Sequence, residues 1–308
     1  MSQYTEKYGP WALVVGASIG LGAAWAEECA KRGFHLVICA RRKDRLETLS
    51  QRLQKEYGVE VRTFSVDISQ EAAYDTILEN IRDLDIGMCI YNAAIEHGGY
   101  FIKVEEEHHL RQIVGNAVIP MRLSWYLCRD MARKNRGCIL LVSSMAGIIG
   151  TANQSSYGAT KAFMAQLAET LWYEMRKYGV TVAGVTVGSV ATPQFYQQQA
   201  AQGTNMEAGA SYDYSDLLEG LTIEPDILKA TPHTPEEVAA YVLEHVEDGP
   251  RLFSHKEDQL SYEGYNRMSR RDGCLFMGRN TDKFFSAGLS NLGLDNGEKP
   301  EEEFKEIL

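Results

Sequence analysis

The sequence has little positive charge, and this shortage bears on its partners. Its 31 Lys and Arg residues are outnumbered by 42 Asp and Glu residues, and the net charge at pH 7 is -11. A protein that binds nucleic acid gathers cations against the phosphate backbone, so this balance argues against such a partner. The acidic excess predicts solubility instead.

Signals for metal binding and for membrane insertion are also missing. The six cysteines have no C-x-x-C spacing, and the seven histidines form neither an H-E-x-x-H motif nor a Cys/His pair at zinc spacing. The uncharged run at residues 11–26 is shorter than the roughly 20 apolar residues of a membrane span and is interrupted by glycines. We therefore predict no metal, no disulfide, no membrane segment and a protein of the reducing cytoplasm.

What the sequence does contain is an alternation of short apolar runs with longer amphipathic segments, such as residues 43–57 and 70–82. This alternation is typical of a parallel sheet whose crossover helices lie on both faces. We predict an α/β fold, a Rossmann-type doubly wound parallel sheet of seven strands with helices on both faces. The expected strands are residues 12–15, 35–39, 60–66, 88–91, 138–143, 180–187 and 251–254.

Two regions interrupt the alternation. Residues 193–232 contain consecutive glutamines and scattered aromatic residues, which predicts a long excursion that forms a substrate lid. The tail from residue 256 ends in the acidic stretch 298–306, which predicts a solvated and partly disordered terminus. We therefore expect a catalytic domain over residues 1–255 that includes the lid, and a C-terminal extension over residues 256–308.

A glycine-rich turn follows the first expected strand. Gly16, Gly20 and Gly22 precede a helix-like segment, and glycines at such a turn let the backbone approach a pyrophosphate at the helix N-terminus. Glycines also serve tight turns that bind nothing, but the position after the first strand favours phosphate binding. The second strand ends in Arg41 and Arg42, where an NAD-binding turn would carry an acid. A guanidinium can pair with a 2′-phosphate, so we predict NADPH/NADP+ rather than a merely solvated basic helix start.

Tyr157 and Lys161 lie four residues apart at the start of a helix-like segment and so project from one face. A nearby cation stabilises a phenolate, and we therefore expect Lys161 to lower the pKa of Tyr157. Ser144 closes the fifth strand, where open α/β sheets bind ligands. Asn116 stands beside a glycine and before a proline, a poor helix position that predicts a functional kink.

These motifs together resemble the short-chain dehydrogenase/reductase family over residues 10–255. That family has a T-G-x-x-x-G-x-G turn, a fourth strand that ends N-N-A-G, and a tetrad of Asn, Ser, Tyr and Lys. The resemblance implies that Asn116, Ser144, Tyr157 and Lys161 are catalytic, with Tyr157 as the proton donor and Ser144 holding the substrate oxygen. Val15, Tyr91, Ala94 and Val187 depart from the family pattern but leave the tetrad intact.

The resemblance also implies the cofactor contacts. Asp67 is expected at the adenine amino group and Thr192 at the nicotinamide carboxamide. The residues predicted to bind the cofactor are Gly16, Ser18, Ile19, Gly20, Gly22, Arg41, Arg42, Asp67, Ile68, Asn92, Tyr157, Lys161, Val190 and Thr192.

The substrate is less constrained than the reaction. The Ser143–Gly147 and Tyr157–Phe163 segments look like those of bacterial hydroxysteroid dehydrogenases, which implies a bulky apolar alcohol or ketone such as a hydroxysteroid or bile acid. Broad carbonyl or ketoacyl reductases and a non-catalytic NADPH-sensing regulator are the alternatives. Ser144, Tyr157 and His97 are the expected substrate contacts.

A second apolar row on the segment after Tyr157 bears on assembly. Met164, Ala168 and Trp172 add to a face that already contains Leu167, so the segment has more apolar surface than one buried face requires. Members of the resembled family pair this helix with a symmetry mate. We predict a homodimer or homotetramer.

Overall fold

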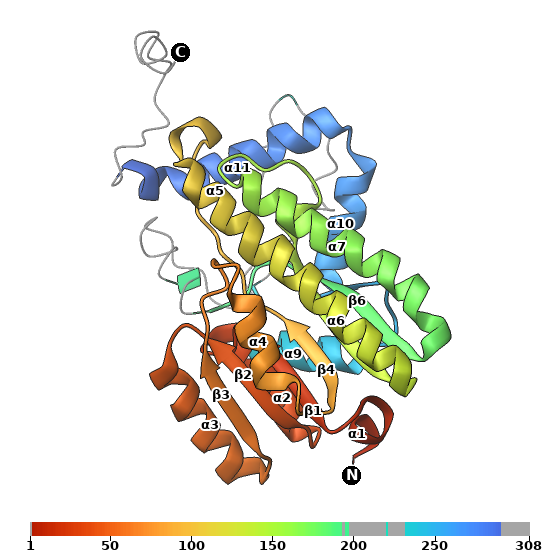
Figure 1. The fold of residues 1–308 in the computed structure, drawn as a ribbon. Helices are drawn as coiled ribbons and strands as arrows, with labels where there is room; N and C mark the ends of the chain where they lie inside the picture. The colour runs from red at the N-terminus through yellow and green to blue at the C-terminus, as the bar shows by residue number, and fades with distance from the viewer. Residues whose placement is uncertain (1, 193–194, 197–219, 221–231, 291–308) are drawn as a thin grey trace.

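The computed structural model describes residues 2–192, 195, 196, 220 and 232–290 of the chain, with side chains up to residue 282. Its centre is a sheet of seven parallel strands in the order β3-β2-β1-β4-β5-β6-β7 (Figure 1). The predicted doubly wound sheet of seven strands is confirmed. The strands are Trp11–Val15 (β1), His35–Ala40 (β2), Val61–Ser65 (β3), Ile86–Tyr91 (β4), Gly137–Ser144 (β5), Val180–Val187 (β6) and Arg251–Phe253 (β7).

Helices cover both faces of this sheet, so each central strand is buried on both sides and reads as a nearly continuous apolar run. β4, for example, is buried throughout. One face is covered by α2 (Gly20–Lys31), α3 (Lys43–Tyr57) and α9 (Pro235–Glu244), and the other by α4 (Ala73–Ile81), α6 (Ile119–Lys134) and α7 (Ser155–Met175) (Figure 1). The shorter helical segments are α1 (Gln3–Tyr8), η1 (Phe101–Lys103), α5 (Glu106–Ile113), η2 (Val114–Val118), η3 (Met145–Gly147) and η4 (Arg176–Tyr178).

The strand order reverses at β1, which pairs with β2 on one side and with β4 on the other. In open α/β sheets a ligand binds in the crevice beyond the carboxyl ends of the strands at such a point. The glycine turn follows β1 there, and Asn92 follows β4. The fold therefore places the predicted cofactor motif at the position where the sheet topology opens a crevice.

The predicted kink near Asn116 is a π-helical turn, η2, between α5 and α6. The hydroxyl of Tyr91 donates a hydrogen bond of 2.6 Å to the Gly115 carbonyl inside this turn. π-helical turns are short insertions that recur at functional sites. The departure of Tyr91 from the family pattern thus has a structural use, because its phenol supports the turn that contains Asn116.

The C-terminal extension is helical where the structure describes it. Residues 256–290 form α10 (Lys256–Arg267) and α11 (Arg270–Ser290), and the acidic stretch 298–306, on which the expected solvated or partly disordered terminus rests, lies outside the described residues. Asp282 on α11 accepts hydrogen bonds from the Tyr100 hydroxyl at 3.1 Å and from Asn153 Nδ2 at 2.8 Å. Phe276 is buried against Ile149. These contacts fasten α11 to two loops at the carboxyl edge of the sheet.

The expected lid at residues 193–232 lies almost entirely outside the described residues. The chain before and after it is joined by backbone hydrogen bonds, from the Ala191 N–H to the His233 carbonyl at 2.8 Å and from the His233 N–H to the Ser189 carbonyl at 3.2 Å. The two ends of the segment therefore meet at one place. Thr234 then caps α9 together with Glu237.

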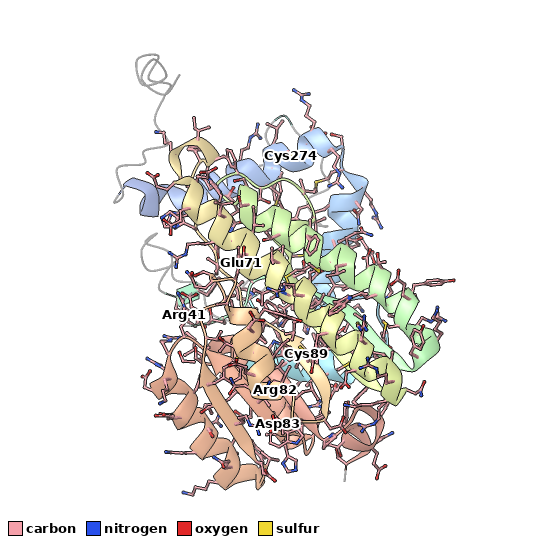
Figure 2. The ribbon with its side chains drawn as sticks, viewed as in Figure 1. Arg41, Glu71, Arg82, Asp83, Cys89 and Cys274 are labelled. Carbon is pink, nitrogen blue, oxygen red and sulfur yellow. The ribbon has the colours of Figure 1, made fainter. Side chains whose placement is uncertain are left out.

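The second apolar row on α7 packs against the sheet of its own chain. Met164 and Ala168 are buried against the sheet of their own chain, and Trp172 packs on the same core. This row completes the internal core, and the homo-oligomer stays a prediction. All six cysteines are free thiols, of which Cys89 is buried and Cys274 on α11 is exposed (Figure 2). Within the described part of the chain, no helix is long and apolar enough to cross a bilayer.

Candidate active site

The glycine turn after β1 is held in place by Asn92. The Asn92 Nδ2 group donates to the Gly16 carbonyl at 3.2 Å, and its Oδ1 accepts from Trp25 Nε1 on α2 at 3.2 Å. Gly16 has a φ of 89°, in the left-handed region that favours glycine, and a Cβ atom on Gly22 would collide with the Gly16 carbonyl. The turn thus presents bare backbone at the N-terminus of α2, which fits the pyrophosphate of a dinucleotide.

A cleft of about 230 Å³ opens beside this turn. Arg41 and Arg42 line it, and Arg42 Nη2 donates a hydrogen bond of 3.2 Å to Ser18 Oγ. Figure 2 shows Arg41 at the edge of the sheet near β2 and β3. These cations and hydroxyl suit a phosphate on the adenosine ribose. The cleft brings together eight of the predicted cofactor residues: Gly16, Ser18, Ile19, Arg41, Arg42, Asp67, Ile68 and Asn92.

Asp67 lies at the rim of the same cleft, after β3. Its Oδ1 accepts from the Ser69 N–H at 3.0 Å. Burial works to raise the pKa of Asp67, but hydrogen bonds from Ser69 and the charges of Arg41 and Arg111 hold that pKa below its usual value. Asp67 is therefore an ionised acceptor, which suits an amino group such as that of adenine.

Thr192 approaches the turn from the opposite side. A Cβ atom on Gly20 would lie 3.1 Å from Thr192 Cγ2, so the two residues are in contact. Val190 forms a parallel bridge with His233, which fixes the backbone next to Thr192. The predicted cofactor residues outside the cleft lining thus include Thr192 and Val190, which flank the glycine turn.

The four predicted catalytic residues come from three neighbouring elements. Ser144 ends β5, Tyr157 and Lys161 lie in the first turns of α7, and Asn116 lies in η2. Ser144 lies near enough to Tyr157 to act on its pKa, and Lys161 Nζ is 5.5 Å from the centre of the Tyr157 ring. The fold therefore gathers Ser144, Tyr157 and Lys161 at one edge of the sheet.

Asn116 is fully buried and joins two parts of this site. Its amide exchanges two hydrogen bonds of 2.8 Å with the backbone of Ile95, on the loop after β4. Its Nδ2 also donates to Thr160 Oγ1 on α7 at 3.3 Å. In this structure Asn116 fixes the β4 loop against the helix that contains Tyr157 and Lys161.

The electrostatics of Tyr157 differ from our expectation. Burial raises the pKa of Tyr157, the negative charge of Glu96 adds to the rise, and the hydrogen bond with Ser144 only partly opposes it. Lys161 Nζ donates to the Val142 carbonyl at 2.7 Å, and burial lowers the pKa of Lys161 to about 8. Burial therefore outweighs the lowering of the Tyr157 pKa expected from Lys161, whose ammonium group is bound by a strand carbonyl.

Glu96 is the residue that sequence reasoning missed. It follows β4, its side chain is exposed, and its Oε1 accepts a hydrogen bond from Gln154 Nε2. The adjacent His97, predicted as a substrate contact, stacks its ring on His108 with centroids 4.0 Å apart. Glu96 lies in a loop and belongs to no motif, so the sequence gives no signal for it. The structure shows its role because its charge acts on the pKa of Tyr157.

Comparisons with known proteins agree with this geometry. A family model described as short chain dehydrogenase matches residues 10–203. A 7beta-hydroxysteroid dehydrogenase of Collinsella aerofaciens is 34% identical over 188 residues, which make up 61% of this chain and 72% of that protein.

Two solved structures extend the likeness over most of the fold. One, from a study of 7beta-hydroxysteroid dehydrogenase stereoselectivity, has a TM-score of 0.75 at 27% identity and covers 90% of this chain and 99% of that chain. A short-chain dehydrogenase from Sphingobium yanoikuyae in complex with NADPH has a TM-score of 0.65 at 27% identity over 79% of this chain and 86% of that chain. The motifs, the sheet order and these relatives together show that the chain belongs to the short-chain dehydrogenase family.

Proposed function

We propose that this short-chain oxidoreductase uses NADPH to interconvert a ketone and a secondary alcohol. The observation that carries the proposal is the meeting of Ser144, Tyr157 and Lys161 at the sheet edge that also holds the glycine turn. When bound, NADPH supplies the hydride for the carbonyl carbon. The chain supplies the groups that hold the substrate oxygen and move its proton.

Each of those groups has a distinct task in ketone reduction. Tyr157 donates its hydroxyl proton to the developing alkoxide, and Ser144 donates a hydrogen bond to the same oxygen. A pKa raised by burial keeps the Tyr157 phenol protonated, which is the form that an acid catalyst requires. Lys161 is the residue that would hold the nicotinamide ribose, and Asn116 fixes the helix that positions both.

The choice of NADPH over NADH rests on charge. Arg41 and Arg42 line the cleft and Arg42 is joined to Ser18, so two cations and a hydroxyl are available for the 2′-phosphate. The NADPH complex of the Sphingobium yanoikuyae relative is in line with this choice.

The substrate that we propose is a hydroxysteroid or bile acid. The support comes from the 7beta-hydroxysteroid dehydrogenase relative and from the match to the related structure over 90% of this chain. That match extends beyond the glycine turn and the tetrad to most of the chain. A broad carbonyl or ketoacyl reductase remains the alternative outcome of the test.

A panel assay of NADPH consumption tests the function. The panel contains oxo-steroids, oxo-bile acids, ketoacyl thioesters and small ketones, and Ser144→Ala serves as the inactive control. We expect turnover on at least one bulky ring ketone, with kcat/KM far above that for small ketones. Turnover of ketoacyl thioesters alone would contradict the proposed steroid substrate and favour a ketoacyl reductase. NADPH binding without turnover on any ketone would contradict an enzymatic function and favour an NADPH-sensing regulator.

We also propose a homo-oligomer, on a surface other than the α7 row first considered. Exposed apolar side chains gather on α5, α6 and α7, and Ile113 and Phe163 line a groove of about 310 Å³ among them. Apolar patches of this kind mark interaction surfaces. Light scattering that gives the mass of a dimer or tetramer would agree with this proposal, and the mass of a monomer would contradict it.

We keep the catalytic domain at residues 1–255 and the cytoplasmic location as proposals.

A further inference from the structure

His233, His255 and Glu257 form a cluster away from the residues proposed for catalysis, and we call it the His–His–Glu cluster. His233 follows the segment 193–232, whereas His255 and Glu257 lie between β7 and the first turn of α10. One ligand atom from each of the three lies within 4.8 Å of the other two. These residues are far apart in the sequence and match no metal motif, which is why the sequence predicted no metal.

The hydrogen bonds within the cluster leave one buried atom unexplained. His255 Nδ1 is in hydrogen-bond contact with Glu257 Oε2, but His233 Nε2 is buried and has no hydrogen-bond partner among the residues that the structure describes. Its distance to Glu257 Oε2 is 3.7 Å, which is too long for a hydrogen bond. A buried polar atom without a partner is uncommon and calls for a water or an ion.

The distance between His233 Nε2 and Glu257 Oε2 is close to the spacing of two ligands on one metal ion. Zinc binds imidazole nitrogen and carboxylate oxygen at about 2.0–2.2 Å, so two ligands of a tetrahedral ion are about 3.4 Å apart. The 3.7 Å between His233 and Glu257 is close to this spacing. Glu257 is more than a third exposed, so its carboxylate is free to rotate away from His255 and admit an ion.

We propose that the His–His–Glu cluster binds one zinc ion, with His233, His255 and Glu257 as ligands and a water at the fourth position. Two imidazoles and one carboxylate suit a divalent transition metal, whereas magnesium and calcium prefer oxygen ligands. Zinc would pair with the buried lone pair of His233 Nε2, which no group within the described part of the chain reaches.

The surroundings of the cluster are negatively charged, as a cation requires. Asp258 is the next residue along α10 and accepts from the Ser254 hydroxyl, which in turn accepts from the Gly188 N–H at 2.9 Å. Glu237 lies near enough to act on the charges of both histidines. The N-terminus of α10 opposes a cation, but three carboxylates outweigh that partial charge.

The position of the site suggests what the ion does. His233 is paired through its backbone with Ser189 and Ala191, directly before Thr192, and the other two ligands lie at the N-terminal end of α10. One ion would therefore join the returning end of segment 193–232 to α10. This is a structural task, and it does not depend on the reaction proposed above.

Zinc titration of the untagged full chain tests the proposal. The protein is treated with EDTA, dialysed and titrated with zinc by calorimetry, on a Cys274→Ser background because Cys274 is the exposed thiol. We expect one zinc per chain, and we expect His255→Asn and Glu257→Gln each to weaken binding by at least about tenfold. The matched control is His245→Asn, whose ring lies against Tyr241 nearby but outside the cluster. It should bind zinc as the parent does.

A second measurement needs no variant, in case one of them fails to fold. Zinc added to the parent protein should slow hydrogen exchange around residues 233 and 255–257, and magnesium or calcium at the same concentration should not. Binding of less than one zinc per chain, loss of binding in His245→Asn equal to that in His255→Asn, or protection elsewhere in the chain would each overturn the proposal.

Discussion

The two halves of the proposed active site differ in how far their side chains are exposed to solvent. On the β1–β3 side, Arg41 and Arg42 are exposed at the mouth of the cleft. On the β4–β5 side, Asn116 and Lys161 are 0% and 2% exposed. Solvent screens exposed charges, so their interaction with a ligand is weak. Buried groups have pKa values shifted by desolvation, and their geometry is fixed by packing. We therefore expect the exposed half to select the cofactor and the buried half to control the chemistry.

The largest effect is expected in the buried half. Tyr157→Phe removes both the transferred proton and a hydrogen bond to the substrate oxygen while keeping the ring and its packing. We expect kcat to fall by about 10³-fold. The affinity for NADPH, measured by fluorescence titration, should change little. Turnover that survives within a few fold of the parent enzyme would remove Tyr157 as the proton donor.

A smaller effect is expected in the exposed half. Arg41→Asp places a carboxylate where we propose the 2′-phosphate, so the KM for NADPH should rise at least about tenfold with kcat nearly unchanged. Raising the ionic strength should reduce the difference in the KM for NADPH between Arg41→Asp and the parent enzyme, because the site is open to solvent. Arg82→Asp is the matched control, an exposed arginine at the end of α4 (Figure 2). Equal effects of the two substitutions would mean that net charge, not a phosphate site, is responsible.

Features that depend on neighbouring residues in the sequence could be predicted, and features that depend on the folded surroundings could not. The seven strands and the glycine turn were predictable because apolar runs and glycines are local signals. Ser144, Tyr157 and Lys161 were predictable because their spacing follows from strand and helix ends. Local patterns also suggested the irregular turn at Asn116, where Gly115 and Pro120 disfavour a regular helix.

Other features could not be predicted because they depend on which loops the fold brings together. Burial decides that Lys161 binds the Val142 carbonyl and that the pKa of Tyr157 rises, and no spacing in the sequence encodes burial. Met164 and Ala168 looked like a surface row only because the depth of α7 against the sheet was unknown. The His–His–Glu cluster likewise appears only when the chain after segment 193–232 returns beside α10.

The smallest expected effect measures how far the buried half depends on Glu96. The charge of Glu96 raises the pKa values of both Tyr157 and Lys161, so Glu96→Gln should lower both. Alcohol oxidation requires the deprotonated phenol as proton acceptor, and its rate rises with pH as Tyr157 ionises. The rising limb of kcat/KM against pH for oxidation should therefore move to lower pH, by about 0.5–1 unit.

The control for this shift is Glu71→Gln, which removes an equal charge from an exposed position before α4 (Figure 2). Its pH profile should match that of the parent enzyme, because the charge of Glu71 is not among those that act on Tyr157 or Lys161. A Glu96→Gln profile that stays in place, or moves to higher pH, would show that desolvation alone sets the acidity of Tyr157. The buried half would then tune its proton donor through burial, with Glu96 serving only to hold Gln154 through their hydrogen bond.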